Sequence, residues 1–387
     1  MAEWSVAPVI DWLMHKGRHL ATREEVVGGI CERVRAAGMP IERVAFFFYA
    51  LHPQYFGVAL YWDGEKVVSR PGNHAFLETA EYRDSPAARI SAGERAIRRR
   101  LDVPAQQLDF PFLLELKASG LTDYVIAEVV FGNGVRNSVS LATRRPGGFT
   151  DHDIAEIEQL LHPFALVMEN HSGHELARTL LETYLGKISG SRVLEGQIKR
   201  GDGEEIEAVI WFSDLRDSTP LSRALGERRF LELVNACFEA TAGAVLEHGG
   251  EVLRFIGDAS LAVFPTAYGG VRDACGRSVR AARSARARAG AANAERRAAG
   301  LPEFASGIGL HLGRVLYGNI GTAERLEFSV IGAAANEAAR IEALCKDTGQ
   351  DVVLSQTVAA QLGEPCPSLG KFSLRGVEKP LEVFALP

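Results

Sequence analysis

Two aspartates in the second half of the sequence have the setting of metal-binding residues. Residues 206–214 read I-E-A-V-I-W-F-S-D, which predicts a strand that runs into Asp214. Residues 251–264 read E-V-L-R-F-I-G-D-A-S-L-A-V-F, which predicts two strands joined by a tight Gly257-Asp258 turn. Carboxylates at a strand end and at the tip of a neighbouring hairpin can hold two divalent cations about 3.5–4 Å apart. Magnesium suits such a site because it binds few carboxylates together with substrate phosphates.

A further segment adds an amide and a guanidinium. Residues 307–321 read G-I-G-L-H-L-G-R-V-L-Y-G-N-I-G, which predicts a strand and a glycine-rich turn. Residues 326–342 read L-E-F-S-V-I-G-A-A-A-N-E-A-A-R-I-E, a short strand followed by a helix on which Asn336 and Arg340 share one face. Such a pair can orient a ribose and neutralise charge on a reacting phosphate. Taken singly, each feature also fits a turn aspartate or an exposed helix face.

In this order and at this spacing, the motifs resemble the catalytic domain of class III adenylyl and guanylyl cyclases. The resemblance covers about residues 204–387 and rests on F-S-D-L-R-x-S-T, F-I-G-D, G-I-G-L-H-x-G-x-V-x-x-G-N-I-G and V-I-G-x-x-x-N-x-A-A-R. It implies a ferredoxin-like βαββαβ fold and a head-to-tail homodimer with shared active sites. It also implies two Mg²⁺ ions per site, with Mn²⁺ as the alternative.

The resemblance implies roles for five residues at the reacting centre. Asp214 and Asp258 match the two metal-binding aspartates, and the backbone carbonyl of Leu215 would also contact a metal. Asn336 and Arg340 match the catalytic pair that fixes the ribose and stabilises the pentavalent phosphorus. In a shared site, the aspartates come from one chain and the asparagine and arginine from the other.

Four more residues are candidates for substrate binding, two of them as alternatives for one role. Arg254 stands where adenylyl cyclases usually carry the purine-reading lysine, and Ser329 stands where they carry aspartate or, in one subclass, threonine or serine. The base that binds the triphosphate is either Arg375 or Lys379 in the tail. A further departure is Asp217, which replaces the family's usual glycine and adds a negative charge to the phosphate loop.

The favoured prediction is an adenylate cyclase. It would convert ATP to 3′,5′-cyclic AMP and pyrophosphate by two-metal-assisted attack of the ribose 3′-hydroxyl on the α-phosphate. The guanidinium of Arg254 can donate to adenine N1 or to guanine O6 and N7, which leaves a guanylate or dual-specificity cyclase as an alternative. Against guanine, no glutamate stands at that position, and Ser329 offers a hydroxyl to the adenine amino group. A second alternative is a degenerate dimeric nucleotide-binding signalling module.

The first half of the chain predicts a separate domain. Apolar spacing predicts a helix over residues 23–35, and β-branched and aromatic runs predict strands at 44–49, 57–62, 124–131 and 138–143. A break at residues 147–151 precedes a helix that Thr150 or Asp151 can cap, with an apolar stripe at Ile154, Ile157, Leu160, Leu161, Phe164 and Met168. This layout, ending in T-R-R-P-G-G-F-T-x-x-D, resembles a GAF sensor domain.

The sequence therefore predicts an α+β protein with two domains. Residues 1–170 form a GAF-like α/β sensor for an unknown small molecule or protein, residues 171–203 a helical connector, and residues 204–387 the cyclase domain. Leu176, Leu180 and Tyr184 have the spacing of a helix that pairs with its twin in a dimer.

Composition narrows the class of protein. The 387 residues are 47% hydrophobic and 24% charged, as in globular proteins, and the net charge of −6 argues against a nucleic-acid partner. The five cysteines are scattered singly, which predicts neither a zinc site nor a disulfide framework. No apolar run approaches the roughly 18 residues of a membrane span, and the N-terminus lacks the order of a signal peptide. We expect a cytoplasmic protein without a membrane partner.

Overall fold

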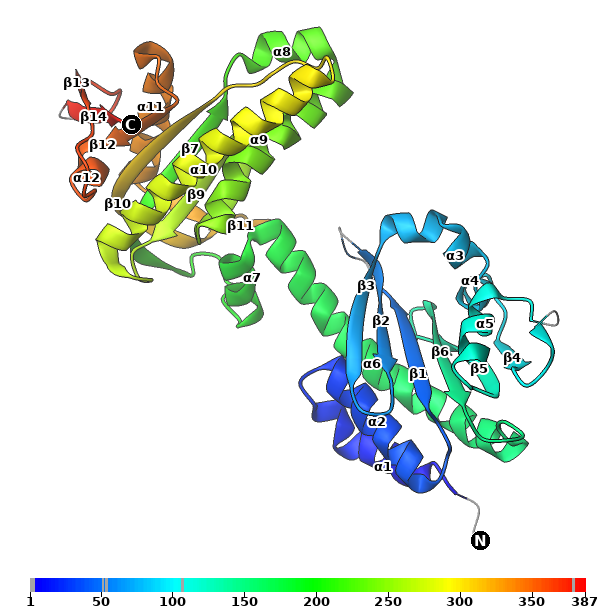
Figure 1. Ribbon diagram of the computed structural model, residues 1–387. Coiled ribbons are helices and arrows are strands. Elements are labelled where there is room, and N and C mark those ends of the chain that lie inside the picture. Colours follow the sequence, from blue (N-terminus) through cyan, green and yellow to red (C-terminus); the bar gives the residue numbers. More distant parts are fainter. Residues whose placement is uncertain (1–3, 51, 53–54, 106–107, 378–379) are drawn as a thin grey trace. The chain divides into compact units, whose positions relative to one another are not determined.

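The computed structural model describes residues 4–50, 52, 55–105, 108–377 and 380–387 (Figure 1). The chain divides into two compact units, Met1–Leu180 and Leu181–Pro387. The division falls inside the long helix α6 (Asp151–Leu185) and within the predicted connector. In the described part of the chain, no helix is both long and apolar enough to cross a membrane.

The first unit is built on a six-stranded antiparallel sheet. Its strands follow the order β3-β2-β1-β6-β5-β4, with β1 Arg43–Tyr49, β2 Tyr55–Trp62, β3 Val67–Asn73, β4 Ala96–Arg100, β5 Asp123–Val130 and β6 Arg136–Thr143. The four predicted strands are confirmed as β1, β2, β5 and β6, whereas the two edge strands were not predicted. That this unit is a GAF-type sensor stays a prediction.

Helices cover both faces of this sheet (Figure 1). One face packs against α1 (Ala7–His15), α2 (Arg23–Ala37) and α6, and the predicted helix at 23–35 is confirmed as α2. The other face carries a 3₁₀ turn at His74–Glu78 and the short helices α3 (Ala80–Arg83), α4 (Pro86–Ser91) and α5 (Pro111–Ala118).

Helix α6 begins with a reciprocal cap. The hydroxyl of Thr150 accepts from the backbone N–H of Asp153 (3.1 Å), and the Asp153 carboxylate accepts from the backbone N–H of Thr150 (2.7 Å). Thr150, rather than Asp151, is therefore the cap. The predicted apolar stripe is confirmed, because all six of its residues belong to or pack on the first unit's main core.

The second unit has the predicted ferredoxin-like topology. Its central strands are β7 (Gly203–Leu215), β8 (Glu251–Ile256), β9 (Ala259–Pro265) and β10 (Ser306–Gly321), in the antiparallel order β10-β7-β9-β8. Connections through α9 (Glu227–Glu247) and α10 (Gly270–Ala298) complete the βαββαβ pattern. The remaining elements are α7 Lys187–Leu194, α8 Ser218–Leu225, β11 Leu326–Ile331, α11 Ala333–Thr348, β12 Val352–Ser355, α12 Gln356–Ala359, β13 Ser368–Phe372 and β14 Leu381–Ala385.

Alternation along β7 distributes helices over both faces of this sheet. Val209 and Trp211 point into a core with α9 and α10, whereas Ala208 and Ile210 point into a core with α11. The sheet is thus buried on both sides, which holds the ends of β7, β9 and β10 in fixed register.

Candidate active site

Asp214 and Asp258 come together at one end of the catalytic sheet. Asp214 is the penultimate residue of β7, and Asp258 is the second residue of the turn between β8 and β9. Gly257 has a φ of 65° and Asp258 has no positive φ, which is the pattern of a type II′ hairpin turn with glycine first. Strands β7 and β9 are neighbours, and the hydroxyls of Ser213 and Ser260 lie 2.8 Å apart just beside the two aspartates.

The electrostatics of this pair favour a cation. Burial, followed by the charge of Asp258, raises the pKa of Asp214, and a hydrogen bond between the two carboxyls acts in the same direction. The backbone N–H of Leu215 opposes the shift only in part. Two carboxyl groups that resist joint ionisation in the free protein are suited to bind a divalent cation, because the cation offsets the repulsion between their negative charges. Among the described residues, no cluster of three or more His, Cys, Asp or Glu side chains offers a fuller set of ligands.

The loop after Asp214 contains an unusual backbone conformation. Asp217 has φ 55° and ψ 32°, and within the described ranges it is the one residue other than glycine with a positive φ. Aspartate tolerates the left-handed region better than most residues, which explains how it replaces the family's glycine. Its side chain is exposed and makes no cap for α8.

Helix α11 presents different groups on its two sides. Asn336 and Arg340 lie four residues apart on one face, and in the part of the chain that the structure describes neither side chain has a hydrogen-bond or ion-pair partner. Glu342 lies about 200° round the helix from Arg340. A Cβ placed on Gly307 would lie 2.2 Å from the Glu342 Oε1, and Gly307 pairs with Asp214 across β10 and β7.

Glu342 therefore belongs to the surroundings of Asp214, and sequence reasoning missed it. Burial and the charge of Asp214 raise the pKa of Glu342 to about 7, and Arg216 opposes this shift. The Arg216 guanidinium donates to the Gln350 carbonyl oxygen, so it points toward the end of α11. The only signal in the sequence was the acidic residue two positions after Arg340, on the opposite side of a helix.

The predicted triphosphate-binding residues lie in the tail. A Cβ on Gly376 would lie 3.5 Å from both terminal nitrogens of Arg340. Arg375 directly precedes this glycine. The side chain of Arg340, the predicted catalytic arginine, therefore lies next to the backbone that carries one of the two predicted triphosphate-binding residues. Lys379 lies outside the described residues.

Arg254 lies on β8 and Ser329 on β11, two strands that do not pair with each other but approach where Arg254 contacts Glu327. Ser329 is 2% exposed and its hydroxyl has no hydrogen-bond partner within the described part of the chain. Nε of Arg254 lies 3.2 Å from Oε1 of Glu327, a residue the sequence prediction omitted. Because side chains alternate along a strand, Glu327 shares the face of Ser329, and that period of two was the signal available. The side chains of Arg254, Glu327 and Ser329 thus provide a cation, an anion and a hydroxyl in one region of the second unit.

A buried network joins helix α7 to the catalytic sheet. Glu251, at the start of β8, is 2% exposed. Its Oε1 accepts from the backbone N–H (2.7 Å) and hydroxyl (2.8 Å) of Ser189, and its Oε2 accepts from the Tyr317 hydroxyl (2.6 Å). Since β8 also carries Arg254 and leads to Asp258, this network ties the predicted connector to a strand of the site.

Comparisons with known proteins found similar sequences and a similar solved structure. A family model described as the adenylate and guanylate cyclase catalytic domain matches residues 203–386. An uncharacterized protein of Mycobacterium tuberculosis is 32% identical over 243 residues, which are 61% of this chain and 41% of that protein. Adenylate cyclase 1 of Rhizobium meliloti is 26% identical over 322 residues, which are 82% of this chain and 48% of that protein.

A solved structure of the guanylyl cyclase Cya2 is 29% identical, covers 47% of this chain and 92% of that chain, and has a TM-score of 0.43. The chain spans less than half the length of the two curated relatives named above. The family-model match over residues 203–386 and the βαββαβ topology indicate the same family for this part of the chain. Residues 203–386 belong to the adenylate and guanylate cyclase catalytic domain family.

Proposed function

We propose that this chain is a homodimeric adenylate cyclase, which converts ATP to 3′,5′-cyclic AMP and pyrophosphate under the control of its N-terminal unit. The observation that carries the proposal is the approach of Asp214 and Asp258 at one end of the sheet. Asn336 and Arg340 lie on a face of α11 turned away from Asp214, and among the described residues neither side chain has a hydrogen-bond or ion-pair partner. The adenylate cyclase among the relatives supports ATP as the substrate.

The two aspartates fit a pair of Mg²⁺ or Mn²⁺ ions, because their mutual repulsion is unrelieved in the protein alone. Asp214, Asp258 and the Leu215 carbonyl would hold the ions. When bound, the ions lower the pKa of the ribose 3′-hydroxyl and stabilise the pyrophosphate that leaves.

The remaining residues bind and orient the nucleotide. Asn336 holds the ribose so that its 3′-oxygen lies in line with the α-phosphorus, and Arg340 neutralises the charge that develops on the phosphate. Arg254 donates to adenine N1, and the Ser329 hydroxyl accepts from the amino group. The 3′-oxygen to phosphorus bond forms as the bond to pyrophosphate breaks, and the hydroxyl proton passes to solvent.

The geometry of α11 supports a site shared between two chains. Glu342 lies on the Asp214 side of the helix and Arg340 on the opposite side, so one chain does not bring Arg340 to its own aspartates. In a two-fold dimer, the aspartates of each chain can face Asn336 and Arg340 of the other chain, which forms two equivalent sites.

Conversion of GTP is the second candidate, and Glu327 favours it. A carboxylate can accept from guanine N1–H and the N2 amino group, while Arg254 donates to O6 and N7. The 3.2 Å contact between Arg254 and Glu327 places both groups together. If guanine is read in this way, Glu327→Gln lowers kcat/KM for GTP relative to that for ATP.

Control by the N-terminal unit rests on the connector. Helix α7 is fixed to β8 by the hydrogen bonds between Ser189 and Glu251. A shift of α7 would therefore move the strand that carries Arg254, and small displacements at a reacting centre can cost about a hundredfold in rate.

Complementation between two inactive variants tests the proposal. Purified Asp214→Ala and Arg340→Ala chains should each fail to turn over ATP or GTP with magnesium or manganese. Co-expressed, they should recover one working site in each heterodimer. If the chains pair at random, half of the dimers are heterodimers, so at most about a quarter of wild-type activity should return. Activity that stays at the level of either parent contradicts the shared site, and full activity in either single variant contradicts the assigned chemistry.

A further inference from the structure

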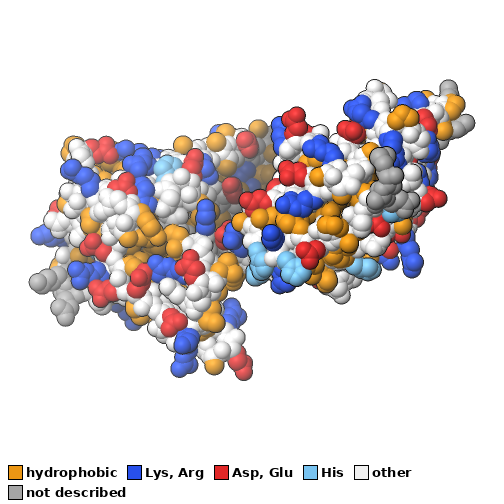
Figure 2. All heavy atoms as spheres, turned by 90° about the horizontal axis from the view of Figure 1, so that it is seen from below, with side chains coloured by type: hydrophobic (Ala, Val, Ile, Leu, Met, Phe, Trp, Pro, Cys, Tyr) orange, Lys and Arg blue, Asp and Glu red, His pale blue; other side chains and the backbone are white. Residues whose placement is uncertain are grey.

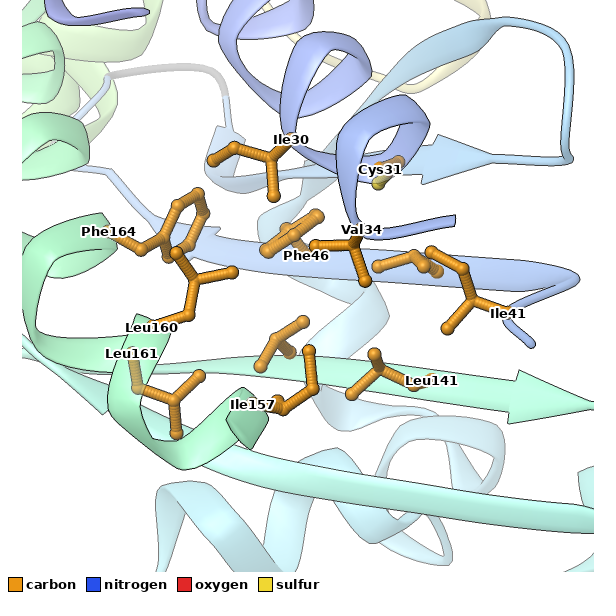
Figure 3. A pocket seen from close by; sticks show the side chains of 12 residues that line it. Ile30, Cys31, Val34, Ile41, Phe46, Leu141, Ile157, Leu160, Leu161 and Phe164 are labelled. Carbon is orange, nitrogen blue, oxygen red and sulfur yellow. The ribbon is translucent and has the colours of Figure 1, made fainter. Parts of the chain in front are cut away.

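The two faces of the first unit's sheet are filled to different degrees. Toward α2 and α6, large apolar side chains interlock, and the rings of Phe46 and Phe164 lie 4.6 Å apart (Figure 3). The void that remains there has a volume of only about 30 Å³ and purely apolar walls. Such a space is the size of one water molecule and offers it no polar partner, so this face is packed core.

The opposite face encloses a cavity of about 970 Å³. It lies between the sheet and the 3₁₀ turn, α3, α4 and α5, and its volume is at the upper end of the roughly 300–1,000 Å³ typical of ligand sites. The cross-strand register leaves a small side chain between two large ones on this face of the sheet. Ala59 lies between Phe47 and Arg70, and Gly57 pairs with Gly72.

Aromatic rings line one side of this cavity. Phe56 lies 5.9 Å from Tyr49, 6.3 Å from Phe76 and 6.2 Å from Tyr82, measured between ring centroids. The hydroxyls of Tyr49 and Tyr82 are 2.6 Å apart, which ties β1 to α3 and fixes the orientation of these rings. The Phe56 ring packs directly on Gly72, so the wall rests on the sheet beside Ala59. A rigid aromatic wall next to a small side chain suits a flat ring system.

Two arginines provide positive charge at the other side. The guanidinium groups of Arg43 and Arg70 lie 5.5 and 5.3 Å from the centroid of the Tyr61 ring. Among the described residues, neither arginine has a carboxylate within ion-pair distance, although Arg43 is half-buried on the sheet floor.

Carboxylates in the lining do not cancel this charge. The four acidic lining residues are all solvent-exposed: Asp63, Glu81, Asp84 and Glu115. Asp63 already accepts hydrogen bonds from the backbone N–H groups of Glu65 and Lys66. The sheltered charge of the cavity is therefore that of Arg43.

We propose that this cavity binds a planar aromatic ligand that carries an acidic group. The ring system lies over Ala59 on the sheet, beside the aromatic wall. The acidic group lies at Arg43 and Arg70, whose delocalised guanidinium groups match a carboxylate, sulfonate or phosphate. The inference does not depend on the activity proposed for the second unit.

Calorimetric titration of the full-length protein with two probes of one ring system and opposite charge tests the site. We expect saturable binding of 2-naphthoate and at least tenfold weaker binding of 2-naphthylmethylammonium. Equal affinities, tighter binding of the cation, or no saturable binding of either probe would overturn the proposal.

Three variants locate the binding. Arg43→Gln should weaken 2-naphthoate at least tenfold and leave the amine unchanged, whereas Ala59→Phe should fill the cavity and abolish binding of both. The matched control is Arg33→Gln, because Arg33 stacks at 3.9 Å over Trp12 outside the cavity lining. Circular dichroism establishes that each variant is folded. Should Ala59→Phe not fold, the contrast between Arg43→Gln and Arg33→Gln still decides, and equal behaviour of those two contradicts the site.

Discussion

The two sheets of this chain carry sites of different construction. In the second unit, a few charged groups stand at strand ends, a hairpin tip and a helix, and each occupies a fixed place in a motif. In the first unit, the proposed site is a cavity over the small side chain of Ala59, between an aromatic wall and two arginines. Replacing one charged group should abolish the activity of the second unit. Abolishing the cavity of the first unit requires a larger side chain that fills it.

Removing one charge from the second unit is the strongest test of this contrast. Asp214→Asn should lower turnover of ATP at least about a hundredfold, because metal assistance contributes several kcal/mol to the transition state. The fold should persist, since the substitution removes repulsion from Asp258 rather than a stabilising contact. Steady-state kinetics and thermal unfolding measure the two effects.

The matched control is Glu303→Gln, which changes an exposed carboxylate that pairs with Arg297 and has no predicted role in metal or nucleotide binding. It should leave both turnover and the melting temperature near wild type. Wild-type turnover in Asp214→Asn would show that the aspartate pair does not carry the chemistry.

The same contrast explains how far sequence reasoning reached. The alternation of β7 and the Gly257-Asp258 turn predicted the position of both aspartates, because each feature is local in the chain. Strands β3 and β4 escaped prediction because they are edge strands, and β4 consists largely of arginines. Glu327 and Glu342 escaped because a charged residue on a strand or helix usually faces solvent.

The cavity escaped for a different reason. Its volume depends on which residues of β1, β2 and β3 face one another, and that register is not written in any one segment. The sequence shows Gly57, Ala59 and Gly72 as three unremarkable small residues. Only the cross-strand register shows that Ala59 lies between Phe47 and Arg70 and that the two glycines lie opposite each other.

The second prediction concerns pH. Glu342 has a folded-state pKa of about 7, above the ordinary 4.5 that it regains on unfolding. Below about pH 4.5 the group is protonated in both states and costs nothing. As pH rises from 4.5 to 7, the unfolded state ionises first, so stability falls, by roughly 3 kcal/mol in total at 1.36 kcal/mol per pKa unit.

Glu342→Gln should remove this loss. In metal-free buffer, urea unfolding at pH 5 should give similar stabilities for the two proteins, whereas at pH 8 the variant should be more stable. Equal stability at pH 8 would mean that burial and the charge of Asp214 do not raise the pKa of Glu342 in the folded protein.

The third prediction is smaller and concerns the buried network. Glu251→Gln replaces one acceptor oxygen with an amide donor and removes the negative charge, so the Tyr317 hydroxyl must turn to the Ser189 hydroxyl, 2.9 Å away, as its acceptor. A hydrogen bond to a charged group contributes about 1.5–3 kcal/mol and a neutral one about 0.5–1.5 kcal/mol, so the exchange should cost about 1–2 kcal/mol, which urea unfolding should detect. If the network positions β8, kcat should fall while KM for ATP changes little. Glu247→Gln, at a half-exposed residue paired with Arg288, is the control and should cost less than about 1 kcal/mol. A Glu251→Gln protein with wild-type stability and kcat would remove the network from the proposed control mechanism.

The smallest expected effect is at Asp217, where backbone and charge can be separated. Asp217→Gly relieves the positive φ but gives the unfolded chain more freedom, so the two effects on stability should nearly cancel, to within about 1 kcal/mol. Both Asp217→Gly and Asp217→Asn remove an exposed negative charge from the loop that would receive the triphosphate. A charge in water interacts by about 1 kcal/mol at 4 Å, which corresponds to a rise of a few-fold in kcat/KM for ATP, and salt should diminish it. A rise in both variants assigns the effect to charge, because asparagine keeps the side-chain shape and tolerates the left-handed backbone. A rise in glycine alone assigns it to the backbone. No rise in either would mean that the exchange of glycine for Asp217 leaves nucleotide binding unaffected.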